Sequence, residues 1–263
     1  MGSYLPLTWV EVGVSALLLL LIAAASLIFR LGIFRRTVYA ATRAFIQLAL
    51  VGYWFGFVFS SESPLWVGVA VLIMFAVAVG NAYYESAEGR SELFWPISTA
   101  LLASLLLVVV PTLMLVVPVE RIWEPQYAIP LSGIVLGNTM TAVILFNDRM
   151  WGELMNRQEE VLGYLALGAT PHQALYSLKR TAIRTALLPT INGLLTMGVV
   201  AVPGVLTGQL ISGVIPIEAV KYQIVVLHMW AAGATVGMVS VALTASRQYF
   251  PLPRPANQSP TPN

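Results

Sequence analysis

Residues 148–186 read DRMWGELMNRQEEVLGYLALGATPHQALYSLKRTAIRTA, a long polar interval in an otherwise apolar chain. Within it Val161, Leu162 and Leu165 recur at helical spacing among charged residues, which predicts an amphipathic helix over about 150–167. Gly168 follows at the point where such a helix would stop. The interval therefore begins as a helix that ends at a glycine.

A second helix start follows directly. Thr170 is a typical N-cap, Pro171 suits the first helical position, and Gln173 can complete a capping box. These signals predict a second helix over about 171–186. Two helices separated by a glycine, between membrane spans, indicate a surface that another protein binds. The alternative is an amphipathic loop that lies on the membrane.

The composition indicates a membrane protein. Of 263 residues, 58% are hydrophobic and 10% are charged, whereas soluble domains carry about 25% charged residues. Long apolar runs predict an all-α integral membrane protein, a polytopic helical bundle. The chain has no cysteine, which excludes disulfides and thiol catalysis. Its two lysines, Lys179 and Lys221, lie in no phosphate-binding GxxxxGK[ST] loop, so no nucleotide site is expected on this chain.

Hydropathy predicts about seven transmembrane helices within a transmembrane domain spanning 1–250. Residues 148–186 join the fifth and sixth helices, and the proline-rich tail 251–263 is expected to be disordered. The predicted spans are about 7–29, 38–59, 65–83, 94–117, 127–147, 187–212 and 219–245.

The arginines and lysines predict the orientation. With the N-terminus outside, eleven of them fall on the cytoplasmic side and only Arg121 and Lys221 fall outside, while Arg43 can snorkel inward. The C-terminus and residues 148–186 are therefore expected in the cytoplasm. The cytoplasmic set is Arg30, Arg35, Arg36, Arg90, Arg149, Arg157, Lys179, Arg180, Arg184, Arg247 and Arg254.

Small residues indicate close helix packing. Four glycine pairs have the spacing that lets membrane helices approach closely, which favours a compact bundle and a homodimer. Pro203 and Gly204 fall inside the predicted sixth span, where they should open the backbone locally beside a cavity. The pairs are Gly52/Gly56, Gly133/Gly137, Gly204/Gly208 and Gly233/Gly237.

Polar residues within or at the ends of the spans are candidates for a substrate path, because polar side chains are costly in hydrocarbon and usually face the bundle interior. The alternative is that they form structural hydrogen bonds between helices. No cluster of histidine and carboxylate residues has metal-ligand spacing, and no arrangement supports hydrolytic catalysis, so an enzyme is not expected. The candidates are Gln47, Asn81, Glu85, Asn138, Asn192, Thr207, Gln209 and His228.

The segment ALGATPHQAL, residues 166–175, resembles the cytoplasmic coupling loop of ABC-transporter permeases. Most of the chain is similar to the FetB-type permease family, which includes a bacterial iron-exporter permease and plant aluminium-tolerance half-transporters. The matching segments are GNTM (137–140), ALGATPHQA (166–174), LLPTIN (187–192) and PGVLTGQLISGVIPIEAVKYQI (203–224).

The resemblance implies an inner-membrane permease of an ABC-type exporter for iron or another metal, with nucleotide sugars as an alternative cargo. A separate ATP-binding subunit would bind ATP and magnesium, and no nucleic-acid partner is expected. Other possibilities are an ion-coupled secondary transporter, with Glu85 as coupling carboxylate, and a membrane scaffold. The expected docking residues are Glu159, Glu160, Leu165, Leu167, Gly168, Ala169, Thr170 and Pro171.

Overall fold

The structure, a computed structural model, describes residues 8–30, 32, 34–61, 63–86, 91–245 and 248–249, and every named element in these ranges is a helix. The predicted disordered tail lies outside the described residues. The elements are α1 (Trp9–Ser15), η1 (Ala16–Leu18), α2 (Leu19–Ile28), α3 (Phe34–Ser61), α4 (Pro64–Ser86), η2 (Ser91–Leu93), α5 (Phe94–Ser104), η3 (Leu105–Val109), α6 (Val110–Leu115), α7 (Pro125–Asn156), α8 (Gln158–Ala166), α9 (Pro171–Ala174), α10 (Tyr176–Thr196), α11 (Gly204–Ile211) and α12 (Pro216–Thr244).

Six helical stretches in the described ranges are long and apolar enough to cross a membrane. This confirms the all-α fold with several spans. The stretches are Trp9–Ile28, Phe34–Ser61, Pro64–Ser86, Phe94–Leu115, Pro125–Asn156 and Pro216–Thr244.

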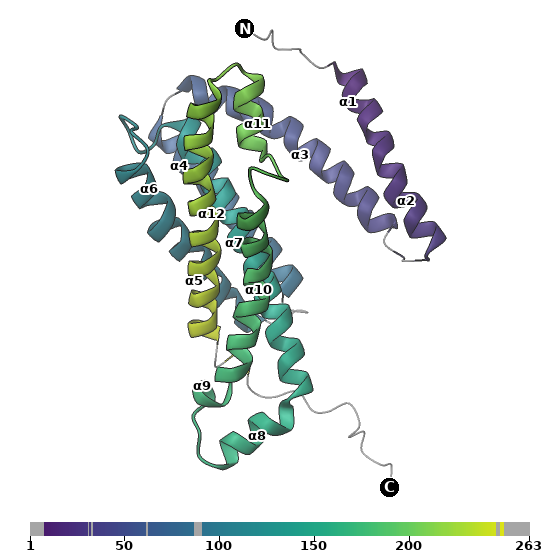
Figure 1. Cartoon of the computed structure of the whole chain (residues 1–263), viewed down its shortest axis with the longest axis vertical. Helices are drawn as coiled ribbons and strands as arrows, with labels where there is room; N and C mark the ends of the chain where they lie inside the picture. The colour runs from purple at the N-terminus through teal and green to yellow at the C-terminus, as the bar shows by residue number, and fades with distance from the viewer. Residues whose placement is uncertain are drawn as a thin grey trace.

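The predicted sixth span, 187–212, is more widely interrupted than the local opening expected at Pro203 and Gly204. α10 ends at Thr196, residues 197–203 are not helical, and α11 begins at Gly204. Gly198 adopts a φ of +89°, which favours glycine, and Pro203 has no backbone N–H to continue a helix. The chain still runs from one end of the bundle to the other between α9 and α12, in two helical pieces (Figure 1). The break includes the position where Pro203 and Gly204 predicted an opening.

The polar interval starts later than expected. α7 continues past the predicted end of its span to Asn156, so the first predicted helix, 150–167, is only α8, Gln158–Ala166. The second, 171–186, is divided at Leu175 into α9 and α10, and α10 runs on through Pro189. Tertiary packing of α10 against α7 and α12 extends this helix beyond its local start and stop signals.

α7 is the centre of the bundle and packs against α4, α5, α10 and α12. Its crossing with α12 is close because Gly233 and Gly237 lie against it. A Cβ on Gly233 would lie 2.8 Å from Val135 Cγ1, and one on Gly237 would overlap Thr139 Cγ2. Of the predicted glycine pairs, Gly233/Gly237 is confirmed as a close helix contact.

Helices α1 and α2 stand apart from the bundle, whereas α3 contacts α4 and α7. α2 packs on α3, and the pair extends to one side of the other helices (Figure 1). Most of their apolar side chains are exposed, among them Leu20, Leu48 and Tyr53. In a membrane these faces meet lipid or protein. A Cβ on Gly52 or Gly56 of α3 would meet no atom within 4 Å.

The span made by α5, η3 and α6 changes its helical winding in the middle. η3 is a π-helical stretch over Leu105–Val109, and Pro111 follows it at the start of α6. A proline ring clashes with the carbonyl four residues earlier in a regular α-helix, here that of Leu107. Widening the preceding turn relieves this clash without ending the span.

Candidate docking site and substrate path

The turn between α8 and α9 lies at the end of the molecule opposite α11 (Figure 1). α8 ends because Gly168 takes a φ of +89°, a left-handed conformation that L side chains rarely adopt. The N–H of Gly168 donates to the Leu165 carbonyl at 3.0 Å, and the N–H of Ala169 donates to the Tyr164 carbonyl at 3.0 Å. The helix end is thus closed by its own backbone, and the predicted stop is confirmed.

The start of α9 has the predicted capping box. The Thr170 side-chain oxygen accepts from the Gln173 N–H at 3.4 Å, and Gln173 Oε1 accepts from the Thr170 N–H at 2.8 Å. Pro171 occupies the first helical turn. The backbone N–H groups of Thr170 and Gln173 each donate to the side-chain oxygen of the other residue. The turn therefore has a defined shape before any other protein binds to it.

The turn presents an apolar tip on a buried base. Leu167 is 87% exposed at the tip, whereas Val161 and Leu175 are fully buried beneath it. The expected docking residues therefore lie on one short segment. Glu159, Glu160, Leu167, Gly168, Thr170 and Pro171 are exposed, and Leu165 and Ala169 are partly buried.

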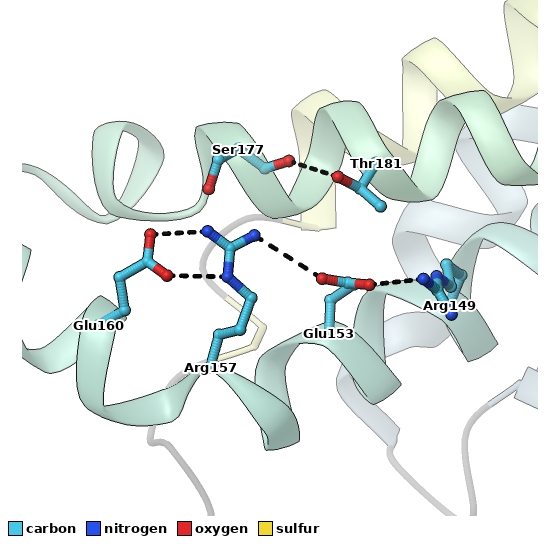
Figure 2. Close-up of polar contacts among 6 residues, drawn as sticks. All are labelled: Arg149, Glu153, Arg157, Glu160, Ser177 and Thr181. Atoms are coloured by element: carbon cyan, nitrogen blue, oxygen red, sulfur yellow. Dashed lines mark hydrogen bonds and ion pairs between the residues drawn. The ribbon is translucent and has the colours of Figure 1, made fainter.

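A chain of ion pairs joins α8 to α7 (Figure 2). Arg149 contacts Glu153 at 2.7 Å, Glu153 contacts Arg157 at 3.7 Å, and Arg157 contacts Glu160 at 2.7 Å. The Glu153 side chain is only 13% exposed. Hydrogen bonding to Glu160, with Glu153 nearby, raises the pKa of Arg157 above its ordinary value. The chain crosses the break between α7 and α8 and fixes the angle between them.

α10 packs its first turns tightly against the bundle. Lys179 is buried, and this burial lowers the pKa of its ammonium group below the ordinary lysine value. Beside it, Thr181 donates to the Ser177 carbonyl at 3.2 Å, as Figure 2 shows. At the end of α12, the Tyr249 hydroxyl donates to buried Asn147 Oδ1 of α7 at 2.8 Å. The Thr181 bond lies within α10, and the Tyr249 bond ties the segment after α12 to α7; the sequence analysis did not single them out.

Two glutamines on the helices beside the break between α10 and α11 have buried side-chain oxygens without a partner among the described residues. Gln223 of α12 is 7% exposed, and its Nε2 donates to Met197 Sδ at 3.7 Å. Its Oε1 has no hydrogen-bond partner among the described residues, and neither has the buried Oε1 of Gln209 on α11. Sequence analysis had placed Gln209 in the path but had not selected Gln223. Gln223 lies about two turns along α12 and is a polar residue inside a predicted span, but nothing in the sequence pairs it with Met197.

The eight predicted path residues do not share one cavity in this chain. Asn138 lies partly buried on α7 and donates to the Ile134 carbonyl at 2.7 Å, whereas Asn192 and Thr207 are exposed on α10 and α11. Gln47 is exposed on α3, and Asn81 is partly buried on α4. Asn192, Thr207 and Gln209 therefore lie on the pieces that flank the break.

Two of the predicted residues lie elsewhere. Glu85, near the end of α4, accepts from Arg36 of α3 with both oxygens at 2.7 Å, so it forms an ion pair between helices. His228 lines a groove of about 300 Å³ together with Pro111, Thr112 and Met229. Among the described residues no group of three histidine, aspartate or glutamate side chains could hold a metal ion.

Residues 9–250 match the uncharacterised protein family UPF0014. The chain belongs to this family. It is 33% identical to a UPF0014 membrane protein of Synechocystis over 94% of its own length and 96% of that protein. It is 32% identical to the "Probable iron export permease protein FetB" of Escherichia coli, covering 89% of this chain and 90% of FetB. It is 30% identical to the "Protein ALUMINUM SENSITIVE 3" of Arabidopsis thaliana, and the match covers 81% of this chain and 77% of that protein.

These relatives confirm the resemblance to FetB-type permeases, and the matches span nearly all of the UPF0014 chain. No solved structure matches it.

Proposed function

We propose that this UPF0014 protein is the membrane subunit of an ABC-type exporter, and that the turn between α8 and α9 docks a separate ATP-binding subunit. The observation that carries the proposal is the preformed turn around Gly168, whose apolar tip is exposed while its base is fixed to α7 and α10. A capped turn loses little conformational entropy on binding, which favours its use as a docking element. ATP and magnesium would bind on the partner.

Iron or another metal is the proposed cargo, because the related FetB protein is named as an iron export permease. Two copies of the permease would assemble in the inner membrane. A Cβ on Gly204 or Gly208 of α11 would meet no atom within 4 Å, so that helix face is available to a second copy. ATP hydrolysis on the partner subunit would move α7 and α10, which are connected to the turn through α8 and α9.

Co-purification with the cognate ATP-binding subunit tests the docking assignment. Leu167→Asp should abolish co-purification and leave the melting temperature unchanged, because Leu167 is 87% exposed. Met155→Asp is the matched control, since Met155 is an exposed apolar residue in the last turn of α7, outside the docking turn. Retention of the ATP-binding subunit by Leu167→Asp at the parental yield would refute the assignment.

The proposed orientation has the N-terminus outside and the docking turn in the cytoplasm. It rests on the arginine distribution and on the placement of the turn at one end of the bundle (Figure 1). A reporter fused after Tyr249 should be active only in the cytoplasm, and one inserted at the 61–63 turn only outside. The reverse pattern would overturn the orientation.

A further inference from the structure

The break between α10 and α11 lies at the depth of the hydrocarbon. Met197 contacts Gln223, which is seven residues, or about 10 Å, along α12 from Pro216. α12 has 29 residues and is about 43 Å long, against about 30 Å of hydrocarbon. If α12 is centred, only about 7 Å of it extends beyond the hydrocarbon at each end. The break therefore lies inside the apolar layer.

The backbone of the break is not covered by the described part of the chain. Val199 is 91% exposed and Val200 is 79% exposed. The carbonyl oxygens of Gly198, Val199 and Val200 accept no hydrogen bond from the described part of the chain. An unpaired backbone group in lipid costs several kcal/mol, so irregular backbone at this depth is covered by protein or faces water.

The helix that leads to the break has a polar exposed face. Arg184, Thr185, Asn192 and Thr196 are all exposed on α10. A groove of about 450 Å³ runs over this helix, and Thr181, Arg184, Thr185, Leu187, Leu188 and Ile191 line it. α10 is also absent from the helices apolar enough to cross a membrane. The groove ends at Ile191, and apolar side chains such as Leu195 are exposed beside the polar ones. The exposed polar side chains nevertheless continue to Thr196, the last residue of α10 before the break, and polar side chains at this depth favour contact with water over contact with lipid.

The unpartnered side-chain atoms in this region are neutral oxygen acceptors. Gln223 Oε1 is held at the break by the contact of Nε2 with Met197, and the described residues offer it no donor. Free carbonyl oxygens of residues 198–200 lie on the adjacent segment. Carbonyl and amide oxygens suit hard cations, and neutral ligands let an ion leave more readily than carboxylates do.

We propose that the break is a water-accessible cation site in the transport path, at which Gln223 Oε1 and the carbonyl oxygens of residues 198–200 hold a partly dehydrated metal ion in transit. The cation class rests on the proposed function, since the ion bound there would be the cargo. Water access to the break does not depend on the proposed function, because it is inferred from the geometry alone. The second copy of the permease would supply the facing wall.

Because the chain has no cysteine, single cysteines can be introduced without removing others. Val200→Cys in membrane vesicles should react with a charged, hydrophilic thiol reagent. Leu72→Cys is the control, because Leu72 is 64% exposed on α4, a regular apolar span. Thiolate is the reactive form and an apolar setting suppresses it, so Val200→Cys should react at least about tenfold faster. Equal rates would overturn water access.

The second measurement tests the cation. Anaerobic Fe²⁺, with Mn²⁺ as a second probe, should slow the labelling of Val200→Cys. Adding Gln223→Leu should abolish this protection without changing the labelling rate in metal-free buffer. Adding Gln126→Leu, at an exposed glutamine at the start of α7, should retain the protection.

Protection that survives Gln223→Leu, or no protection by either ion in Val200→Cys alone, would overturn the cation site. Labelling requires neither ATP nor the ATP-binding subunit, so it is unaffected if the docking assignment fails. Conversely, loss of co-purification in Leu167→Asp reports only on the docking turn. The two proposals can therefore fail independently.

Discussion

Gly237→Ala should destabilise the bundle by forcing apart the crossing of α7 and α12. The added methyl would overlap Thr139 Cγ2 and lie 3.6 Å from Val143 Cγ2. Both residues are fully buried on α7 and have no room to withdraw. Overpacking of this kind costs about 1–3 kcal/mol. At about 2–4 °C per kcal/mol for a chain of this size, the melting temperature in detergent should fall by roughly 2–12 °C.

Two variants test the cause. Gly80→Ala on α4 is the control, because a Cβ there would meet no atom within 4 Å, and it should be neutral or stabilising by up to about 1 kcal/mol. Thr139→Ser removes the methyl that Gly237→Ala would overlap, so the double variant should recover much of the lost stability. If Gly237→Ala melts like Gly80→Ala, or Thr139→Ser gives no rescue, the close crossing is refuted.

Thr170→Val removes the capping box at a cost of about 1 kcal/mol, and hydrogen exchange at residues 168–175 should become faster while exchange in α7 stays unchanged. Tyr249→Phe leaves buried Asn147 Oδ1 without its donor and should lower the free energy of unfolding by about 1–3 kcal/mol; in an Asn147→Leu background the same change should cost much less. Burial lowers the pKa of Lys179, so the unfolded chain holds its proton more tightly than the folded one. Stability should therefore rise with pH from the lowered folded pKa up to the ordinary 10.5, and Lys179→Met should remove this slope.

Local signals in the sequence predicted the geometry of the turn between α8 and α9 well, and the assignment of this turn as a docking site stays a prediction. Gly168, Thr170 and Gln173 act within a few residues of one another, so their capping bonds depend little on the rest of the fold. The end of α7 was harder to place. No glycine or proline marks Arg157, where the chain turns between α7 and α8, and the ion pairs of Arg157 depend on that turn.

The break between α10 and α11 was predicted less completely, because hydropathy does not register backbone conformation. Val199, Val200 and Val202 are apolar, so the segment read as part of a continuous span although Pro203 and Gly204 indicated an opening. The spacing of two glycines likewise does not reveal which helix packs against them. Gly233 and Gly237 pack on α7, whereas a Cβ at Gly52 or Gly56, at the same spacing, would contact nothing within this chain.

The length of α7 has a mechanical consequence. Its 32 residues form a rod about 48 Å long, held between its ends where Thr139 lies against Gly237. Asn156 is about 26 Å from that crossing and Pro125 about 21 Å on the other side. Rotation about the crossing as a fulcrum would displace the two ends in opposite directions by nearly equal amounts. A small tilt imposed at the docking turn would therefore reach the far side of the membrane at about four-fifths of its size, without bending the helix.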